Sequence, residues 1–229
     1  MTHTRKNLTQ LAKVAAIGAV AGALLVLVRG HSRVARAMTA LFTFSPGMRL
    51  SLGLWLVFSI YWSIAAKDSA AKKSSESWWS RQLHLTLVNV ALLLLVLPIP
   101  GLTRRFLPVS GALVAAGLAV QAAFILLAVW ARRHLGSNWS GEVRIATGHQ
   151  LVRTGPYRWV RHPIYTAVLG MYCGTLLVSG EIHAPIALTI VLLAYSRKIS
   201  MEEKALRGAF GAEHEIYRQE TWAWIPGVY

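Results

Sequence analysis

Four long apolar stretches in the first 131 residues constrain the fold more than any other feature of the sequence. Each is close to the length of about 20 residues that an α-helix needs to cross the hydrocarbon core of a bilayer. A helix satisfies its backbone hydrogen bonds internally, which a segment surrounded by lipid has to do. The stretches therefore predict transmembrane helices at Leu11–Val28, Leu50–Ala66, Leu83–Ile99 and Val109–Ala131.

Two shorter apolar runs follow, at Ile164–Ser179 and His183–Tyr195, with only Gly180–Ile182 between them. So tight a connection predicts a helical hairpin. Its second arm is short for an independent span, and we expect it to end in the membrane interface. The sequence thus predicts an all-α fold, a polytopic membrane helix bundle of five or six transmembrane helices.

The first apolar stretch has a second interpretation, as a signal peptide. Arg5 and Lys6 precede it, and Ala35–Arg36–Ala37 has the small-x-small form of a cleavage site. That site lies well beyond the apolar core and is flanked by arginines, so we favour an uncleaved anchor. Whether this segment spans or lies peripherally decides between five and six spans.

The strong positive charge does not indicate a nucleic-acid partner. The 229 residues include 24 Lys and Arg against 9 Asp and Glu, but these cations lie in short stretches between apolar runs. They form no continuous basic face with interleaved aromatic residues. Only 14% of the residues are charged, against about 25% in soluble domains. We therefore expect membrane lipids as partners and no nucleic acid.

The distribution of charge between loops predicts the orientation in the membrane. The loop after the fourth stretch and the C-terminal tail are rich in Arg and Lys, whereas the hairpin turn has neither. The positive-inside rule therefore places the loop and the tail together in the cytoplasm. The connection that contains Lys67, Lys72 and Lys73 agrees with this assignment. Six spans would place Arg29, Arg33, Arg36 and Arg49 outside, against the rule.

The long polar loop that ends at Pro163 is where we expect chemistry. Residues 135–163 read LGSNWSGEVRIATGHQLVRTGPYRWVRHP, which is too polar to enter lipid unprotected. Pro163 suits the first turn of a helix. His162 and Tyr165 are then three residues apart, so both side chains can face one pocket.

A pair of adjacent acids, Glu202–Glu203, follows the apolar hairpin. Carboxylates next to a membrane segment are costly unless they face water, a cation or a ligand. A positively charged ligand would suit this pair. We expect no metal site, since Cys173 is the only cysteine and the histidines lack the short paired spacing of metal motifs.

These C-terminal residues resemble the isoprenylcysteine carboxyl methyltransferase family, within the wider group that includes phospholipid N-methyltransferases. The resemblance covers roughly residues 130–229 and is carried by motifs that begin at His149 and continue past the acidic pair. They read His149–Gln150–Leu151–Val152, Gly155–Pro156–Tyr157, Arg161–His162–Pro163–Ile164–Tyr165, Arg197, Glu202–Glu203, Leu206, Phe210–Gly211 and Tyr217. His214 stands where the family usually has Tyr.

The resemblance implies an S-adenosyl-L-methionine-dependent methyltransferase whose cofactor is held by the loop and the Glu pair. The sequence contains no GxGxxG motif after a strand pattern, so nothing indicates that a Rossmann domain binds the cofactor. Residues 1–131 would form the transmembrane region and residues 132–229 the catalytic region. Catalytic roles would fall on Arg197, Arg161 and Tyr165. The cofactor would be bound by His149, Leu151, Val152, Gly155, Tyr157, His162, Pro163, Tyr165, Glu202 and Glu203.

Several functions remain open from the sequence. The leading one is carboxyl O-methylation of an isoprenylcysteine-like or other lipophilic acceptor, either a small molecule or a lipidated protein. N-methylation of a phospholipid or amine is the close rival, and there His162 or Tyr165 would be a candidate base. A membrane reductase that uses a nicotinamide cofactor is a second class. Transport is disfavoured, because stretches two to four are almost wholly apolar apart from Asn89 and Gln121.

Overall fold

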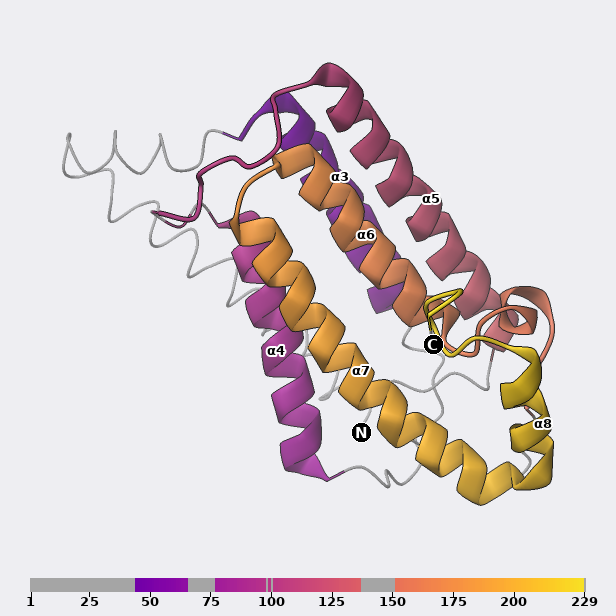
Figure 1. The fold of residues 1–229 in the computed structure, drawn as a ribbon. Coiled ribbons are helices and arrows are strands. Elements are labelled where there is room, and N and C mark those ends of the chain that lie inside the picture. Colours follow the sequence, from indigo (N-terminus) through magenta and orange to yellow (C-terminus); the bar gives the residue numbers. More distant parts are fainter. Residues whose placement is uncertain (1–43, 66–76, 98, 100, 137–150, 229) are drawn as a thin grey trace, which may run out of the picture. The chain divides into compact units, whose positions relative to one another are not determined.

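A computed structural model describes residues 44–65, 77–97, 99, 101–136 and 151–228. These residues belong to one compact unit. They form helices joined by loops, and no β-strand occurs among them (Figure 1). The stretch Leu11–Val28 and the residue His149 lie outside the described residues.

The helices match the predicted apolar stretches closely, and the all-α membrane bundle is confirmed. Capping side chains mark the helix starts at Trp78 and Gly111: Ser77 accepts a hydrogen bond from the Ser80 amide and Ser110 from the Leu113 amide. The elements are α3 (Pro46–Ala65), α4 (Trp78–Val96), α5 (Gly111–Leu135), the short 3-10 helix η3 (Gly155–Arg158), α6 (Pro163–Ser179), α7 (His183–Phe210) and α8 (Ala212–Glu220).

The second hairpin arm differs from the prediction. It does not end near Tyr195 but continues as one helix of 28 residues to Phe210. The polar residues after Tyr195 therefore extend the helix beyond its apolar part instead of ending it. The acidic pair Glu202–Glu203 lies on this polar extension, in the last third of α7.

Three of the described helices are long and apolar enough to cross a membrane, namely α3, α5 and α7. The helix α6 is apolar but shorter, at 17 residues, and α4 has 19 residues. Together these five helices occupy the places of predicted stretches two to six. Because the first stretch is not described, the choice between five and six spans stays a prediction.

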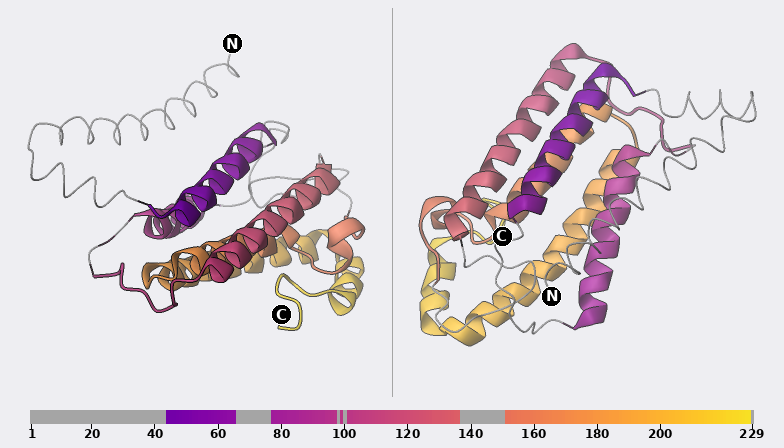
Figure 2. Two further views of the ribbon diagram at one scale, coloured as in Figure 1. Left: turned by 90° about the horizontal axis from the view of Figure 1, so that it is seen from above. Right: turned by 180° about the vertical axis from the view of Figure 1, so that it is seen from behind.

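The helices alternate in direction, which brings several helix ends together (Figures 1 and 2). The Arg132 guanidinium on α5 donates to the Ala65 carbonyl at the end of α3, 2.6 Å away. The Arg197 guanidinium on α7 donates to the Ser80 hydroxyl in the first turn of α4, 2.9 Å away. The opposite end is closed by the loop before α5, where the Phe106 amide donates to the Gly180 carbonyl between α6 and α7.

The pair α5 and α6 packs closely through two glycines. A Cβ atom on Gly174 would lie 2.6 Å from the Gly117 carbonyl oxygen, and the reverse substitution would produce the same clash. Small residues at such crossings let membrane helices approach closely. Next to them, the Gln121 side chain accepts from the Ser51 hydroxyl at 2.7 Å and donates to the Ser51 carbonyl at 3.0 Å, which links α5 to α3.

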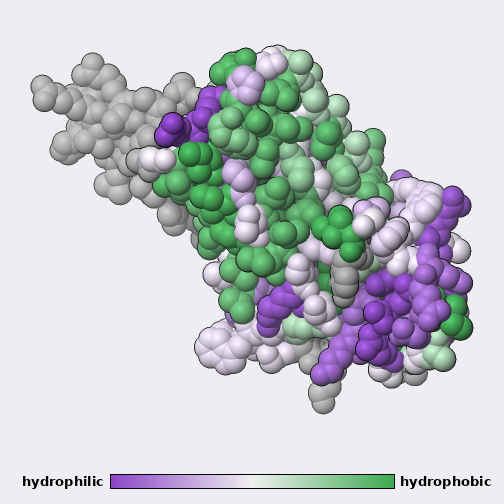
Figure 3. All heavy atoms as spheres, viewed as in Figure 1, coloured by the Kyte–Doolittle hydropathy of each residue, from purple (hydrophilic) through white to green (hydrophobic). Residues whose placement is uncertain are grey.

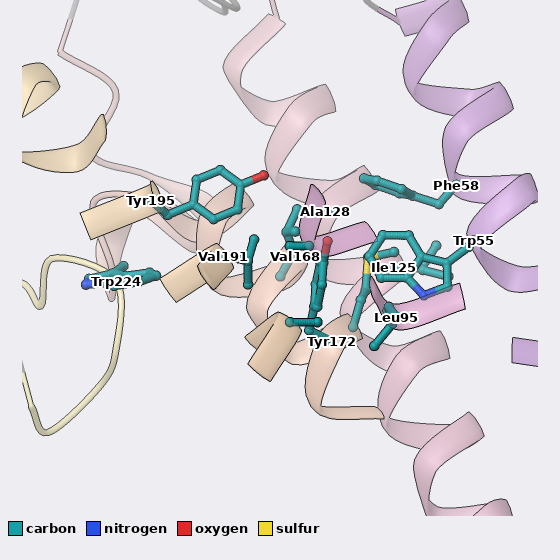
Figure 4. Close-up of a cluster of buried hydrophobic side chains, with 14 of the residues drawn as sticks. Trp55, Phe58, Leu95, Ile125, Ala128, Val168, Tyr172, Val191, Tyr195 and Trp224 are labelled. Carbon is teal, nitrogen blue, oxygen red and sulfur yellow. The ribbon is translucent and has the colours of Figure 1, made fainter. Parts of the chain in front are cut away.

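The apolar core runs between all five long helices. Trp55 packs edge-on against Tyr172 with ring centroids 5.2 Å apart, and its indole N–H donates to the Thr175 hydroxyl. Figure 4 shows this cluster, in which Tyr195 and Trp224 form the edge nearer the chain's C-terminus. In Figure 3, hydrophobic residues cover the helices, whereas hydrophilic residues gather where α7 ends and α8 begins. The core therefore fixes the helix ends that carry the polar residues described next.

Candidate active site

The residues just before α6 are held by the C-terminal tail through backbone hydrogen bonds. The Arg161 amide donates to the Trp222 carbonyl and the His162 amide to the Ala223 carbonyl, both at 2.9 Å. Figures 1 and 2 show the chain after α8 returning to the start of α6. These bonds fix the backbone at Arg161 and His162, so their side chains point in set directions.

The start of α6 aligns His162 and Tyr165 as predicted. Pro163 occupies the first helical position and His162 the N-cap. The rings of His162 and Tyr165 stack at a centroid distance of 5.8 Å with planes 13° apart. On its other side, Tyr165 stacks on Tyr195 of α7 at 4.7 Å. The stack joins the start of α6 to the middle of α7.

Glu203 is a buried acid surrounded by basic side chains. Its Oε1 accepts from the Arg161 Nε at 2.9 Å and from the His162 Nε2 at 2.8 Å. Its Oε2 lies 3.5 Å from the Arg218 Nε and 3.7 Å from the His214 Nε2. The Glu203 side chain is only 8% exposed, so its contacts lie within the protein. We conclude that Glu203 ties α7, the start of α6 and α8 together.

Glu202 has a different environment. Its Oε1 accepts a hydrogen bond from the Tyr165 hydroxyl at 2.6 Å, and its Oε2 lies 3.3 Å from the His162 Nδ1. Its side chain is 20% exposed, and the described residues provide no Arg or Lys as a partner for it. Adjacent residues on a helix point in different directions. Glu203 is therefore enclosed, whereas its neighbour Glu202 is more accessible.

Both nitrogens of His162 face carboxylates, an arrangement that only the protonated imidazole satisfies with two donors. Burial lowers the pKa of His162, but the hydrogen bonds and negative charges of Glu202 and Glu203 outweigh it, so the pKa lies above its ordinary value. For His214, burial dominates over the charge of Glu203, and the nearby Arg161 and Arg218 add to it, so the pKa is lowered. The site thus favours a charged His162 beside a neutral His214.

The segment at η3 forms another part of the candidate site. Gly155 has φ +61°, a conformation that suits glycine, and a Cβ there would meet the His134 ring at 2.8 Å. Tyr157 is buried, and its carbonyl accepts from the Tyr217 hydroxyl at 2.6 Å. Burial raises the pKa of the Tyr157 phenol, so it stays neutral. These contacts hold η3 between the end of α5 and α8.

The structure brings together most, but not all, of the predicted site residues. Arg161, His162 and Tyr165 lie at the start of α6 and contact the acidic pair. Pro163 lies among them as the first residue of the helix. Leu151 is half-buried, and Val152 packs against Ala131, Tyr157 and Ile164. Tyr157 belongs to the same cluster.

Arg197 is the predicted catalytic residue that the described contacts do not join to the acidic pair. It lies one to two turns before Glu202 on α7 and donates to Ser80 at the start of α4. The same hydroxyl contacts the Met201 sulfur at 3.5 Å. Arg197 therefore lies at the α4–α7 contact, on the side of the site that the transmembrane region provides.

Sequence reasoning missed the contribution of α8 and the tail. Arg218 approaches Glu203, and the carbonyls of Arg218 and Thr221 accept from the Arg161 guanidinium. One signal could have indicated this. His214 and Tyr217 are the buried residues of α8 and Arg218 is partly buried, and their spacing of three and four residues places them on one helix face.

Comparison with known proteins identifies the family that this part of the chain resembles. Residues 115–208 match the model of the isoprenylcysteine carboxyl methyltransferase family. A probable protein-S-isoprenylcysteine O-methyltransferase of Oryza sativa subsp. indica is 37% identical over 81 residues, which are 35% of this chain and 42% of that protein. The Saccharomyces cerevisiae protein-S-isoprenylcysteine O-methyltransferase is 35% identical over 81 residues, 34% of its length. The matches thus span less than half of these relatives.

The fold is shared more widely than the sequence. A solved structure of the eukaryotic intramembrane Ras methyltransferase, an isoprenylcysteine carboxyl methyltransferase, aligns with 99% of this chain and 89% of its own chain. The TM-score is 0.53 at 17% sequence identity. The likeness establishes a common membrane fold that extends beyond the residues matched by sequence.

Proposed function

We propose, from the premise that residues 115–208 carry the sequence of the isoprenylcysteine carboxyl methyltransferase family, that this chain is an integral membrane methyltransferase. It transfers a methyl group from S-adenosyl-L-methionine to a lipophilic acceptor, most simply the carboxylate of an isoprenylcysteine-like compound. One observation carries the proposal. The acidic pair of α7 meets His162 and Tyr165 from the start of α6 at hydrogen-bond distance.

The residues at this site fit a cationic cofactor. Glu202 is the more exposed of the two acids. Its neighbours at the site are the Tyr165 hydroxyl, which is uncharged, and the protonated His162. It can accept from the cofactor's ammonium group or ribose hydroxyls, with charge-assisted hydrogen bonds. His149, Leu151, Val152, Gly155, Tyr157, His162, Pro163, Tyr165 and Glu203 complete the proposed pocket.

The cofactor supplies a methyl group on a sulfonium sulfur. An acceptor carboxylate oxygen forms a bond to this methyl carbon while the carbon–sulfur bond breaks, and the bonding electron pair stays on sulfur. The carboxylate is already ionised near neutral pH, so no base has to remove a proton. The protein therefore contributes mainly alignment of the two reactants, an effect worth up to ~10 kcal/mol of the barrier.

The two arginines receive different roles in this proposal. Arg161 uses its Nε and Nη1 for Glu203 and for carbonyls of the tail, so it acts as a positioning residue for the acidic pair. Arg197 has its guanidinium at the α4–α7 contact, next to the transmembrane region through which a lipophilic acceptor would arrive. A guanidinium can hold a carboxylate through paired hydrogen bonds, so Arg197 is the residue proposed to orient the acceptor.

The site is proposed to face the cytoplasm. The described segments around it carry Arg132, Arg133, Arg158, Arg197, Lys204 and Arg207, and the positive-inside rule places such basic segments in the cytoplasm. This location also suits a lipidated protein as the acceptor, since such a protein would reach the site from the cytoplasmic leaflet.

A methyl-transfer assay tests the proposal and its rival. Purified chain in lipid vesicles is given radiolabelled S-adenosyl-L-methionine with either N-acetyl-farnesylcysteine or phosphatidylethanolamine. The proposal expects a base-labile methyl ester on the prenylcysteine and no label on the amine. Label on phosphatidylethanolamine alone would move the assignment to N-methylation. The nicotinamide-dependent reductase is disfavoured by the family match, and binding of a nicotinamide dinucleotide in place of S-adenosyl-L-methionine would restore it.

A further inference from the structure

The outer face of α5 carries a pocket that the proposed reaction does not use. It lies over the last turns of the helix, has a volume of about 390 Å³ and is lined by Leu126, Val129, Trp130, Arg133 and His134. The opposite face of the helix, which includes Ile125, Ala128, Ala131 and Arg132, is buried in the protein. The pocket therefore opens away from the bundle, toward the surrounding membrane.

The pocket changes from apolar to cationic along the helix. Leu126, Trp130 and Arg133 are four and three residues apart, so they follow one another on one face. Leu126 is 69% exposed and Trp130 is 45% exposed. The rise per residue makes this sequence about 10 Å long. A phospholipid has its hydrocarbon chain, glycerol region and phosphate in the same order as Leu126, Trp130 and Arg133, and over a similar depth.

A second segment contacts one of the residues that line the pocket. The Trp159 ring meets the Trp130 ring edge-on, with centroids 5.9 Å apart. The Arg158 guanidinium lies over the Trp159 ring at 4.1 Å from its centroid. Trp159 is 49% exposed, although burial among other residues is the usual state of so large a ring. Two exposed tryptophans and two arginines thus come together from separate parts of the chain.

The two arginines have no anionic partner within the part of the chain that the structure describes. The ion pairs found there use Arg153, Arg161 and Arg218, and none uses Arg133 or Arg158. An anion from outside the protein would satisfy them. Guanidinium groups match phosphate with paired hydrogen bonds, and tryptophan is favoured at the depth of lipid headgroups.

We infer that this face binds the headgroup of an anionic phospholipid, with its phosphate between Arg133 and Arg158 and an acyl chain along Leu126. The apolar half of the pocket selects a lipid over a free phosphate ion, because only the lipid has a chain to cover Leu126. The site adjoins the candidate active site. His134 bonds the Thr154 hydroxyl at 2.7 Å and stacks on Tyr157, so a headgroup here would rest against the segment that leads into η3.

Native mass spectrometry of the full chain, released from nanodiscs of mixed phosphatidylglycerol and phosphatidylcholine, tests the inference. The wild-type chain should retain phosphatidylglycerol in preference. Arg133→Gln combined with Arg158→Gln should weaken this preference at least tenfold, because the loss of even one of the two charge-assisted contacts has about this effect. The matched control, Lys204→Gln with Arg207→Gln, removes the same charge from exposed positions on α7 and should leave the preference intact.

Three outcomes would overturn the inference: equal retention of the two lipids by the wild type, an unchanged preference in the double variant, or an equal loss in the control, which would indicate diffuse attraction to the basic surface. If the double variant fails to insert, Arg133→Gln alone carries the test, and an unchanged preference would again overturn the inference. Because the readout is lipid retention, its result is independent of whether the chain transfers methyl groups.

Discussion

The His162 Nε2 lies 2.8 Å from the Glu203 Oε1, which joins the residue before α6 to the last third of α7 across 41 positions of sequence. The same oxygen accepts from the Arg161 Nε. Through this carboxylate, the two stretches that carry the family motifs become one site. We therefore expect Glu203 to matter mainly for the stability of the protein, and its neighbour Glu202 to matter mainly for cofactor binding.

Replacing Glu203 should destabilise the protein. Glu203→Ala leaves the buried Arg161 guanidinium without its carboxylate, a change that costs about 3–5 kcal/mol in proteins. Thermal unfolding in detergent, followed by tryptophan fluorescence, measures the effect. The control Glu213→Gln removes an equal charge from an exposed position in the first turn of α8 and should cost less than ~1 kcal/mol. Equal unfolding temperatures for the two variants would show that Glu203 does not hold these elements together.

The stability of the protein should depend on pH through His162 and His214, whose pKa values are shifted in opposite directions. The pKa of His162 is raised above its ordinary value of 6.5, so its stabilising contribution is complete below pH 6.5 and is lost as the pH rises through the raised value. The pKa of His214 is lowered, so its contribution is present above pH 6.5 and is lost as the pH falls through the lowered value.

Unfolding temperatures between pH 5 and pH 9 check these signs. His162→Asn should remove the decline on the alkaline side, and His214→Asn should remove the decline on the acidic side. Each variant should leave the other limb unchanged. If His162→Asn kept the alkaline decline of the wild type, the contacts of its two nitrogens with the acidic pair would not account for the charge on this ring.

The close contact between α5 and α6 gives a prediction about packing. Gly174→Ala would place a methyl group 2.6 Å from the Gly117 carbonyl oxygen, and overpacking of this kind costs about 1–3 kcal/mol. Gly208→Ala offers a matched control, because a Cβ there meets nothing within 4 Å and alanine favours the helix by up to ~1 kcal/mol. Unfolding in detergent should separate the two variants in opposite directions. A stabilised Gly174→Ala protein would contradict the observed packing.

The role of Arg197 can be separated from its contact with α4. If Arg197 orients the acceptor, Arg197→Ala should lower kcat/KM at least 30-fold, the equivalent of about 2 kcal/mol. Ser80→Ala removes only the hydroxyl that Arg197 contacts at 2.9 Å and should change kcat/KM by less than about threefold. Equal losses in the two variants would instead assign Arg197 to joining α4 and α7.

The helices were predictable because their cause is local. A long apolar run ended by Gly, Pro or charged residues determines a membrane helix on its own. The stretch Val109–Ala131 is an example, since all but its first two residues lie in α5. The prediction for the second hairpin arm was wrong because it equated the end of the apolar run with the end of the helix. Glu, Lys, Ala, Leu and Arg all favour helices, so the backbone continues as α7 to Phe210 after the side chains turn polar.

The site was predictable only in part. The meeting of the acidic pair with His162 and Tyr165 was anticipated from the family motifs. The division of roles between Glu202 and Glu203 was not, because it depends on how α7 is rotated against α6, which no local pattern fixes. The same holds for Arg161, whose partners Arg218 and Thr221 lie 57 and 60 residues away. Such contacts result from the path of the tail. The spacing of His214, Tyr217 and Arg218 indicates the inward face of α8, but it does not identify Arg161 as the partner.

Cofactor binding by the purified chain tests the central claim most directly. Isothermal titration calorimetry in detergent compares S-adenosyl-L-methionine binding to the wild type, to Glu202→Gln and to the control Glu213→Gln. We predict saturable binding to the wild type and the control, with affinity at least tenfold weaker for Glu202→Gln, the loss expected for a hydrogen bond to a charged group. Its unfolding temperature should stay near that of the wild type. Undiminished affinity in Glu202→Gln, or no binding to the wild type, would contradict the account.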